Sequence, residues 1–340
     1  MTALMKQSRG KGNVGLGGIP RPTPGPGQAL IEVYATGICG TDLHIHDDEY
    51  VSVPPVVMGH EVTGRVVEAG PGAEEHIGKR VAPETYFFTC DACAACRAGR
   101  RNLCLERRSI GSHVNGGFTS HVLVPARNLH EVHPSVGEHA GALYEPLSCV
   151  AQSLCDPAVA SPGDTALVVG PGAMGILAAQ VLRSQGAAVT ISGMARDRAR
   201  LEVARELGFA TVEADGLVDA TPDGGFDVVA DCSGAGPGID SGLKATRRGG
   251  HFVQIGLAGK PIPFDIDIVC LHELTVTSGF ASTPRSWRRV EALVEGGHVT
   301  LAPLVTQAFP LGRWEEAFAR TRAADGLKLV IDPRMDAAGG

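Results

Sequence analysis

The chain has 340 residues, 44% of them hydrophobic and 20% charged, which is the composition of an ordinary globular protein with room for two domains. Its formal net charge of −7 gives no general attraction to nucleic acid or to an anionic membrane, so neither is expected as a partner. No apolar run reaches membrane-spanning length, and the basic N-terminus lacks the apolar core of a secretory signal. We therefore expect a cytoplasmic protein whose nine cysteines are reduced thiols or metal ligands.

The first 150 residues are predicted to be mostly β-structure with many turns. Apolar and polar residues alternate around glycines there, as they do in half-buried strands. The predicted strands lie at 28–36, 56–69, 78–81 and 118–125.

From residue 151 to 288 the pattern changes to strands that alternate with helices. Helices are predicted at 172–186 and 197–208, and continuous apolar strands at 165–170, 187–192, 226–234 and 249–259. This alternation indicates a parallel sheet covered on both faces. Residues 289–340 form a closing segment of amphipathic helices and a last strand at 327–331.

The first turn of the α/β part reads VVGPGAMG and contains G-x-G-x-x-G at Gly170, Gly172 and Gly175. It follows an apolar strand and opens a helix, which is the context that a dinucleotide-binding turn requires. The first glycine permits the tight turn, the second lets the pyrophosphate approach, and the third lets helix and strand pack closely. The helix N-terminus, with Ala173 and Met174, then faces the phosphates. The alternative is a glycine-rich turn that binds no cofactor.

The end of the next strand favours NADP over NAD. An Asp or Glu usually binds the adenosine ribose hydroxyls there, but residues 190–195 contain neither. Asp197 comes late and lies between Arg196 and Arg198. A missing carboxylate and a nearby arginine suit the additional phosphate of NADP, so Arg196 is the predicted phosphate ligand. In the alternative, the cofactor is NAD and both arginines are solvated residues at the start of a helix.

Four cysteines, Cys90, Cys93, Cys96 and Cys104, lie within the stretch CDACAACRAGRRNLC. The spacing lacks the ferredoxin pattern, and a reducing compartment argues against disulfides. Four closely spaced thiolates match a closed tetrahedral zinc site, so we predict a structural zinc lobe at 88–106. The alternative, four unliganded thiols on one loop, would be readily oxidised.

A second set of possible metal ligands lies upstream, with Cys39 in GICGTDLH and with His60 and Glu61 in GHEVTG. A cysteine, a histidine and a carboxylate form a catalytic zinc set, which keeps one position open for water or substrate. Taken alone this signal is weak, because an isolated cysteine is often a small buried hydrophobe.

Together these motifs resemble the zinc-containing medium-chain dehydrogenase family. The match runs in order through GICGTDLH, GHEVTG, CDACAACRAGRRNLC, GALYEPLS and VVGPGAMG and spans essentially the whole chain. Within the family, the chain is most similar to the branch of sorbitol (L-iditol) dehydrogenase and L-threonine 3-dehydrogenase. The resemblance implies an α/β fold with a GroES-like β-rich catalytic domain at 1–150, a Rossmann-type doubly wound parallel sheet at 151–288, and a C-terminal return to the catalytic domain at 289–340.

The resemblance also implies an enzyme that transfers hydride between a polyol or other secondary alcohol and NADP or NAD, with two zinc ions per chain. Cys39, His60 and Glu61 match the catalytic zinc ligands, and the four lobe cysteines match the structural ones. Glu145 of YEPLS matches a nearby carboxylate that ligates the zinc directly or holds its water.

Thr41 and His44 match the family's proton relay from the substrate to water. Relatives suggest a homotetramer or a homodimer. The chain departs from the NAD-using members at Ala195, which stands where they have the ribose-binding acid and is followed by Arg196.

Two alternative functions follow from the same motifs. GTDLHIH is typical of L-threonine 3-dehydrogenases, whereas YEPLSC and FASTPRSW are more like the polyol branch, so L-threonine is the second candidate substrate. The other alternative is a non-enzymatic binding protein that uses the zinc lobe on the same scaffold. The net negative charge of the chain and the complete set of catalytic ligands both disfavour it.

Overall fold

The computed structural model describes residues 1–339 and divides the chain into two compact units. The first unit combines residues 1–146 with the C-terminal residues from Leu301 onward, and the second comprises Leu147–Thr300. Helix α3 (Tyr144–Leu154) carries the chain from the first unit into the second. In the described part of the chain, no helix is long and apolar enough to span a membrane.

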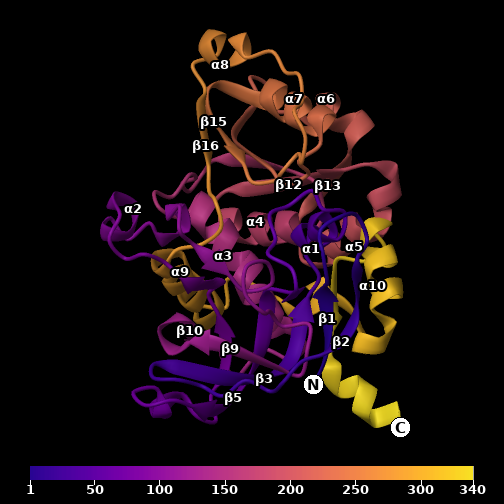
Figure 1. Ribbon diagram of the computed structural model, residues 1–340. Helices are drawn as coiled ribbons and strands as arrows, with labels where there is room; N and C mark the ends of the chain where they lie inside the picture. Colours follow the sequence, from indigo (N-terminus) through magenta and orange to yellow (C-terminus); the bar gives the residue numbers. More distant parts are fainter. Residues whose placement is uncertain (340) are drawn as a thin grey trace. The chain divides into compact units, whose positions relative to one another are not determined.

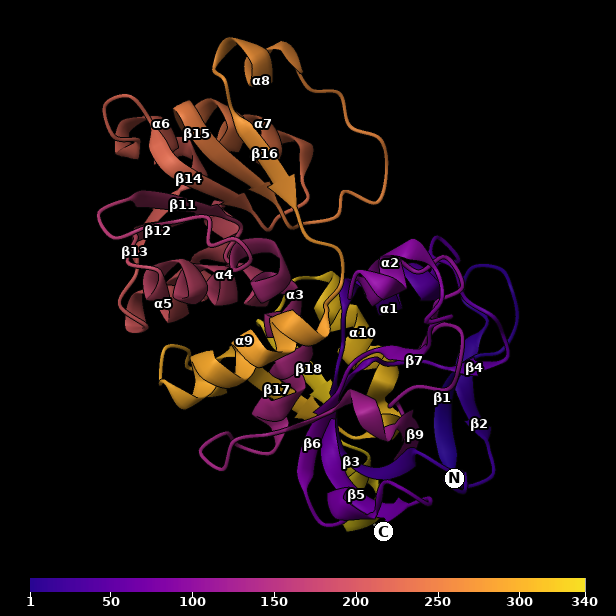
Figure 2. The same ribbon diagram turned by 90° about the vertical axis from the view of Figure 1, so that its left-hand side faces the viewer.

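The first unit is built on a seven-stranded sheet (Figures 1 and 2). Its central strand β3 pairs on one side with β5 and on the other with β18 and β9. The strands, in spatial order, are β10 (Leu129–Glu131), β6 (Arg80–Pro83), β5 (Glu61–Ala69), β3 (Gln28–Gly37), β18 (Lys328–Ile331) and β17 (Val305–Phe309), with β9 (His121–Pro125) beside β3. A core of aliphatic side chains such as Ile31, Val66 and Val124 holds this sheet together by excluding water.

A second, three-stranded sheet packs within the same unit. It consists of β2 (Val14–Gly18), β1 (Thr2–Lys6) and β4 (Val56–Val57). Strands β7 (Tyr86–Phe88) and β8 (Arg108–Ser109) form a separate two-stranded sheet. The helices of the unit are α1 (Gly40–His46), α2 (Ala94–Arg97) and α10 (Trp314–Arg322). Phe118 and Phe318 stack edge to face in a core that joins β1 to α10, so both ends of the chain contribute to one hydrophobic cluster.

The second unit is a six-stranded, entirely parallel sheet with helices on both faces (Figures 1 and 2). The strands, in spatial order, are β13 (Ala210–Glu213), β12 (Ala188–Gly193), β11 (Thr165–Val169), β14 (Phe226–Asp231), β15 (Thr246–Gln254) and β16 (Thr275–Ser278). Helices α4 (Ala173–Ser184) and α5 (Arg198–Glu206) cover one face, and α6 (Leu217–Ala220) and α7 (Gly236–Ala245) the other. Two further helices are α8 (Asp267–Leu271) and α9 (Pro284–Glu295).

The strand order reverses at β11, from which the chain first runs outward to β13 and then crosses to β14. This is the doubly wound Rossmann arrangement, in which ligands bind at the carboxyl ends of the strands beside the reversal. The predicted doubly wound parallel sheet is confirmed, as are the predicted strands and helices of this unit.

Candidate active site

The pairing of β3 with β5 brings the predicted catalytic ligands together. The two strands are antiparallel, and Gly37 at the end of β3 lies opposite Glu61 at the start of β5. Cys39 follows two residues later as the N-cap of α1, in extended backbone conformation, and His60 directly precedes β5. The sulfur of Cys39, a ring nitrogen of His60 and a carboxylate oxygen of Glu61 all lie within 4.8 Å of one another.

The chemistry of this cluster fits a catalytic metal ion. Thiolate, imidazole and carboxylate are the donors that zinc takes in catalytic sites with an open position. Burial alone would lower the pKa of His60, but Asp42 and the Cys39 sulfur raise it well above its usual value, so the cluster favours a positive charge at this point. A divalent cation supplies that charge without a proton.

Asp42 is a functional residue that the sequence reasoning missed. Its side chain is fully buried in the first turn of α1 and accepts hydrogen bonds from the backbone N–H groups of Cys39 (2.9 Å) and Gly59 (3.3 Å). Its Oδ1 also lies 3.7 Å from Nδ1 of His60, so Nε2 is the ring nitrogen that could bind a metal ion. A carboxylate behind a ligating histidine fixes the ring and raises its basicity. The C-x-x-D spacing of a helix start was the available signal.

Lys328 is the second residue that the sequence reasoning missed. It opens β18, is nearly inaccessible to solvent, and donates to both carboxylate oxygens of Glu61 at 2.8 and 2.7 Å. Burial would lower the pKa of Lys328, but the charges of Glu61, Cys39 and Glu145 outweigh it, so the pKa is raised and the side chain is a cation. A lysine in the otherwise apolar run LKLVI was the available signal.

The remaining predicted catalytic residues lie on two helices, α1 and α3. Glu145 is buried in the first turn of α3, and its charge acts on Lys328, although it is not a member of the 4.8 Å cluster. Thr41 and His44 lie three residues apart on α1, which places them on neighbouring positions of one helix face. The ring Nδ1 of the partly exposed His44 lies 2.8 Å from Oε2 of Glu49.

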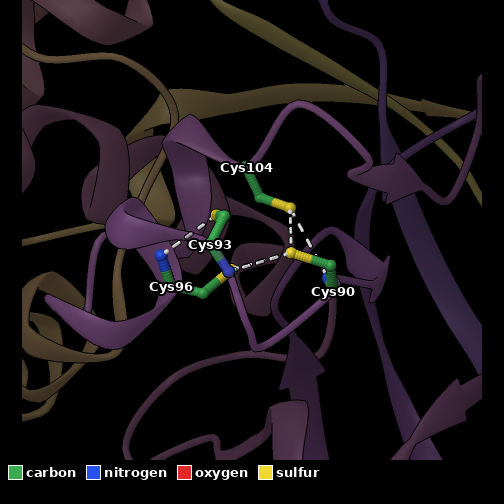
Figure 3. A group of neighbouring side chains, drawn as sticks. All are labelled: Cys90, Cys93, Cys96 and Cys104. Carbon is green, nitrogen blue, oxygen red and sulfur yellow. Dashed lines mark hydrogen bonds between the residues drawn. The ribbon is translucent and has the colours of Figure 1, made fainter.

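The four lobe cysteines converge on a common centre (Figure 3). All four sulfur atoms lie within 4.8 Å of one another, with Cys104–Cys90 at 3.6 Å and Cys90–Cys96 at 4.0 Å. These distances are too long for disulfides and close to the sulfur–sulfur separation of about 3.8 Å in a tetrahedral zinc–thiolate site. Backbone N–H groups of Cys93 and Cys96 point at the sulfurs of Cys90 and Cys93, both at 3.4 Å.

The pKa values of the thiols in the lobe shift in opposite directions. Hydrogen bonds from the backbone of Ala92 and Cys93 lower the pKa of Cys90 to about 7. Desolvation and the neighbouring thiols of Cys93 and Cys104 raise the pKa of Cys96 to about 12. A bound zinc ion would stabilise all four as thiolates, because metal binding displaces the thiol protons.

The predicted glycine-rich turn has the geometry that a pyrophosphate requires. Gly170 has a φ of 101°, in the left-handed region that other residues avoid. A Cβ atom at Gly175 would collide with the carbonyl oxygen of Gly170, so the close packing of β11 and α4 needs a glycine there. Gly172 is the N-cap of α4, and a Cβ atom there would meet nothing within 4 Å, so Ala173 and Met174 form the first turn of a helix whose N-terminal amide groups have no partner within the helix.

The segment after β12 separates Arg196 from its charged neighbours. The Asp197 carboxylate is buried, turns back to accept the backbone N–H of Met194 at 3.0 Å, and lies 3.6 Å from Arg200. Arg198 pairs with Glu213 at 2.9 Å. Among the described residues, the exposed Arg196 has no hydrogen-bond or ion-pair partner.

Comparison with known proteins agrees with this architecture. Residues 25–134 match the model of the alcohol dehydrogenase GroES-like domain, and residues 173–296 match that of the zinc-binding dehydrogenases. The chain is 34% identical to a sorbitol dehydrogenase of Halalkalibacterium halodurans, over 98% of this chain and 99% of that protein. It is also 34% identical to an L-threonine 3-dehydrogenase of Saccharopolyspora erythraea, over 98% and 99% of the two chains.

A solved structure from Sinorhizobium meliloti 1021, described as a zinc-binding dehydrogenase bound to NADP, superposes with a TM-score of 0.89 at 31% identity and covers 98% of this chain and 99% of that one. The fold and the site therefore define a zinc-dependent oxidoreductase that acts on CH–OH groups. The chain belongs to the zinc-binding alcohol dehydrogenase family, with a GroES-like domain and a Rossmann domain. It transfers hydride between a polyol or other secondary alcohol and a nicotinamide cofactor.

Replacing Cys104 by Ser tests the metal lobe. We expect Cys104→Ser to lose one zinc ion per chain and to lower the melting temperature by roughly 5 °C or more, because the closed site loses a ligand. Metal analysis and calorimetry measure both effects. Cys270→Ser is the matched control, since Cys270 is an exposed thiol in α8. A Cys104→Ser protein with its full zinc content would contradict the assignment.

Proposed function

We propose that the chain oxidises a polyol with NADP, and that Cys39, His60 and Glu61 hold the catalytic zinc. The observation that carries this proposal is the convergence of these three ligand types within 4.8 Å at the end of two paired strands. The lobe cysteines would hold the structural zinc. The unit that contains both metal clusters would then be the catalytic domain, and the predicted nucleotide-binding domain at 151–288 falls within the second unit, Leu147–Thr300.

When bound, zinc supplies Lewis-acid polarisation of the substrate hydroxyl, and the nicotinamide supplies the hydride acceptor. The residues of the chain provide ligands, orientation and a path for the proton. Thr41, in the first turn of α1, would accept the hydroxyl proton of the substrate on its side-chain oxygen. The partly exposed His44, one turn further along, would pass it to water, and its ring is oriented by Glu49. Glu145 would hold water beside the metal or enter its coordination shell.

Arg196 supports NADP as the cofactor. It stands directly after Ala195, in the stretch where an NAD-binding acid would lie, and its guanidinium is free of neighbouring carboxylates. The carboxylate of the next residue, Asp197, accepts a hydrogen bond from the backbone N–H of Met194, and Glu213 pairs with Arg198. An unpaired guanidinium is suited to a bidentate bond with a ribose phosphate.

The choice of a polyol as substrate rests on the motifs YEPLSC and FASTPRSW and on the relative named as a sorbitol dehydrogenase. The relative named as an L-threonine 3-dehydrogenase is equally identical, and GTDLHIH favours it, so L-threonine is the second candidate. A cytoplasmic location accords with the reduced thiols that both metal clusters require.

A homodimer or a homotetramer is also proposed, and the free edge of the parallel sheet supports it. Strand β16 pairs with β15 on one side, has no partner strand on the other among the described residues, and all four of its residues are exposed. Beside it lies an apolar cavity of about 450 Å³ whose lining includes Leu257, Phe264 and Val276. A second copy of the chain would cover this edge through the same surface, as a two-fold interface requires.

An assay with purified, zinc-loaded protein tests the reaction. Polyols, simple secondary alcohols and L-threonine are offered with NADP or NAD, and reduced nicotinamide is followed by its absorbance. We expect turnover of a polyol, and turnover of L-threonine alone would establish the second candidate. Cys39→Ser should lose at least about a thousandfold in kcat with an unchanged fold, because the open metal site loses its thiolate. An active Cys39→Ser enzyme would refute this site.

Replacing Arg196 by Ala tests the cofactor preference. Loss of a charged hydrogen bond to the ribose phosphate should weaken NADPH binding about tenfold to a hundredfold and leave NADH binding unchanged. Dissociation constants from nicotinamide fluorescence measure both. Arg198→Ala is the matched control, since its guanidinium is engaged by Glu213. Equal effects on the two cofactors, or tighter NADH than NADPH in the parent protein, would count against NADP.

Replacing Val276 by Arg tests the oligomer. A charge in the middle of β16 should prevent pairing of two sheet edges and shift the protein to monomers in light-scattering measurements of mass. Val218→Arg is the control, because Val218 is an even more exposed apolar residue on α6 of the same unit. If Val276→Arg keeps the parent mass, the interface lies elsewhere.

A further inference from the structure

Lys328 and Glu61 form a buried ion pair beside the proposed catalytic zinc. The ammonium nitrogen lies 2.8 Å from Oε1 and 2.7 Å from Oε2 of Glu61, and it also donates to the carbonyl oxygen of Ile38 at 3.2 Å. A lysine has three N–H donors, so all of them are used. Glu61 and Lys328 are 2% and 7% exposed, which rules out a flexible surface contact.

Gly37 makes this pair possible. It lies on β3 between its two partner strands, opposite Glu61 of β5 and opposite Val330 of β18. A Cβ atom at position 37 would collide with Oε2 of Glu61 and would lie 3.1 Å from Cδ of Lys328. The two charged side chains therefore meet across the one position of β3 that carries no side chain. The absence of a side chain at position 37 is therefore a requirement for the ion pair.

The pair still leaves Glu61 able to bind a metal ion. An ionised carboxylate has about four lone-pair positions, and the ammonium takes one on each oxygen. A carboxylate oxygen of Glu61 lies within 4.8 Å of the ligand atoms of Cys39 and His60 at the same time. One carboxylate can therefore accept from Lys328 and donate to a metal.

Lys328 also offsets part of the negative charge of this cluster. The charges that act on it are those of Glu61, Cys39 and Glu145, and the buried Asp42 adds a further carboxylate beside His60. A divalent metal ion alone would leave an excess of carboxylates in a low-dielectric environment, which is costly, and the ammonium group reduces that excess.

We propose that Lys328 is a positioning residue that holds Glu61 as a single-oxygen zinc ligand and withdraws charge from it. The metal then keeps more of its positive charge for polarising the substrate hydroxyl. The inference rests on the proposed zinc site of Cys39, His60 and Glu61. A purely structural lysine, which only fastens β18 to β3, is the competing explanation.

Cobalt replacement reports on this geometry independently of turnover, because the visible bands of cobalt depend on the number and type of ligands. In Lys328→Met, a long side chain without charge, Glu61 is free to bind with both oxygens. We expect the cobalt bands to shift and weaken, and kcat to fall about tenfold to a hundredfold, as it does when other residues that hydrogen-bond to a metal ligand are replaced. Lys328→Arg should restore part of both.

A double-substitution cycle separates positioning from stability. If Lys328 acts through Glu61, Lys328→Met should have almost no further effect on kcat or on the cobalt bands in a Glu61→Gln background. Lys6→Met is the matched control: Lys6 is another buried lysine of the same unit, and its ammonium donates to the carbonyl oxygens of Gly10, Gly12 and His46. This control should lower the melting temperature and leave the cobalt bands unchanged.

Each outcome decides between the explanations. A folded Lys328→Met protein with the parent's cobalt bands and kcat overturns the inference, and so does an effect of equal size in the Glu61→Gln background. If Lys328→Met fails to fold, Lys328→Arg decides, because the planar guanidinium must move the carboxylate, and unchanged bands then overturn the inference. A parent protein that binds a single metal ion per chain instead refutes the proposed catalytic zinc site itself.

Discussion

The pairing of Gly37 with Glu61 between β3 and β5 is the constraint on which the proposed catalytic site depends. It places Cys39 beside His60 and, because β18 joins the opposite side of β3 at the same point, it brings Lys328 over the glycine to the carboxylate. Buried ion pairs gain little stability, since desolvation of both charges offsets their attraction. The placement of this pair beside a metal-ligand cluster points to a role in the chemistry of the site.

The two metal clusters are assembled in opposite ways. The lobe cysteines come from one short stretch of chain, and their four sulfur atoms lie close together. The sulfurs of Cys90 and Cys93 also accept hydrogen bonds from backbone N–H groups. Such a site has no open coordination position, and the free energy of metal binding contributes to the stability of the fold. The cluster of Cys39, His60 and Glu61 instead depends on strand register, and its ligands are held from behind by Asp42 and Lys328.

Features encoded by local spacing could be predicted from the sequence, and features created by register could not. The lobe cysteines, the glycine turn at 170–175 and the strands of the parallel sheet carry their signals within a few residues. Asp42 lies in the stretch GICGTD, which carried no signal beyond its cysteine and its turn, and Lys328 was only one polar residue in a predicted strand. The short strands β1 and β2 and the exposed β16 were also missed, because glycines and isolated threonines weaken the apolar alternation there.

The division of the chain has a consequence for its synthesis. Residues 147–300 are contiguous and can complete their sheet as soon as they leave the ribosome, whereas the first unit needs strands β17 and β18 from the last part of the chain. At ordinary translation rates the N-terminal residues wait on the order of 10 s or more for β18. During that time the carboxyl-terminal end of β3 is an unpaired sheet edge and Glu61 lacks its lysine partner, so we expect nascent chains that stop before Lys328 to expose a strand edge open to aggregation.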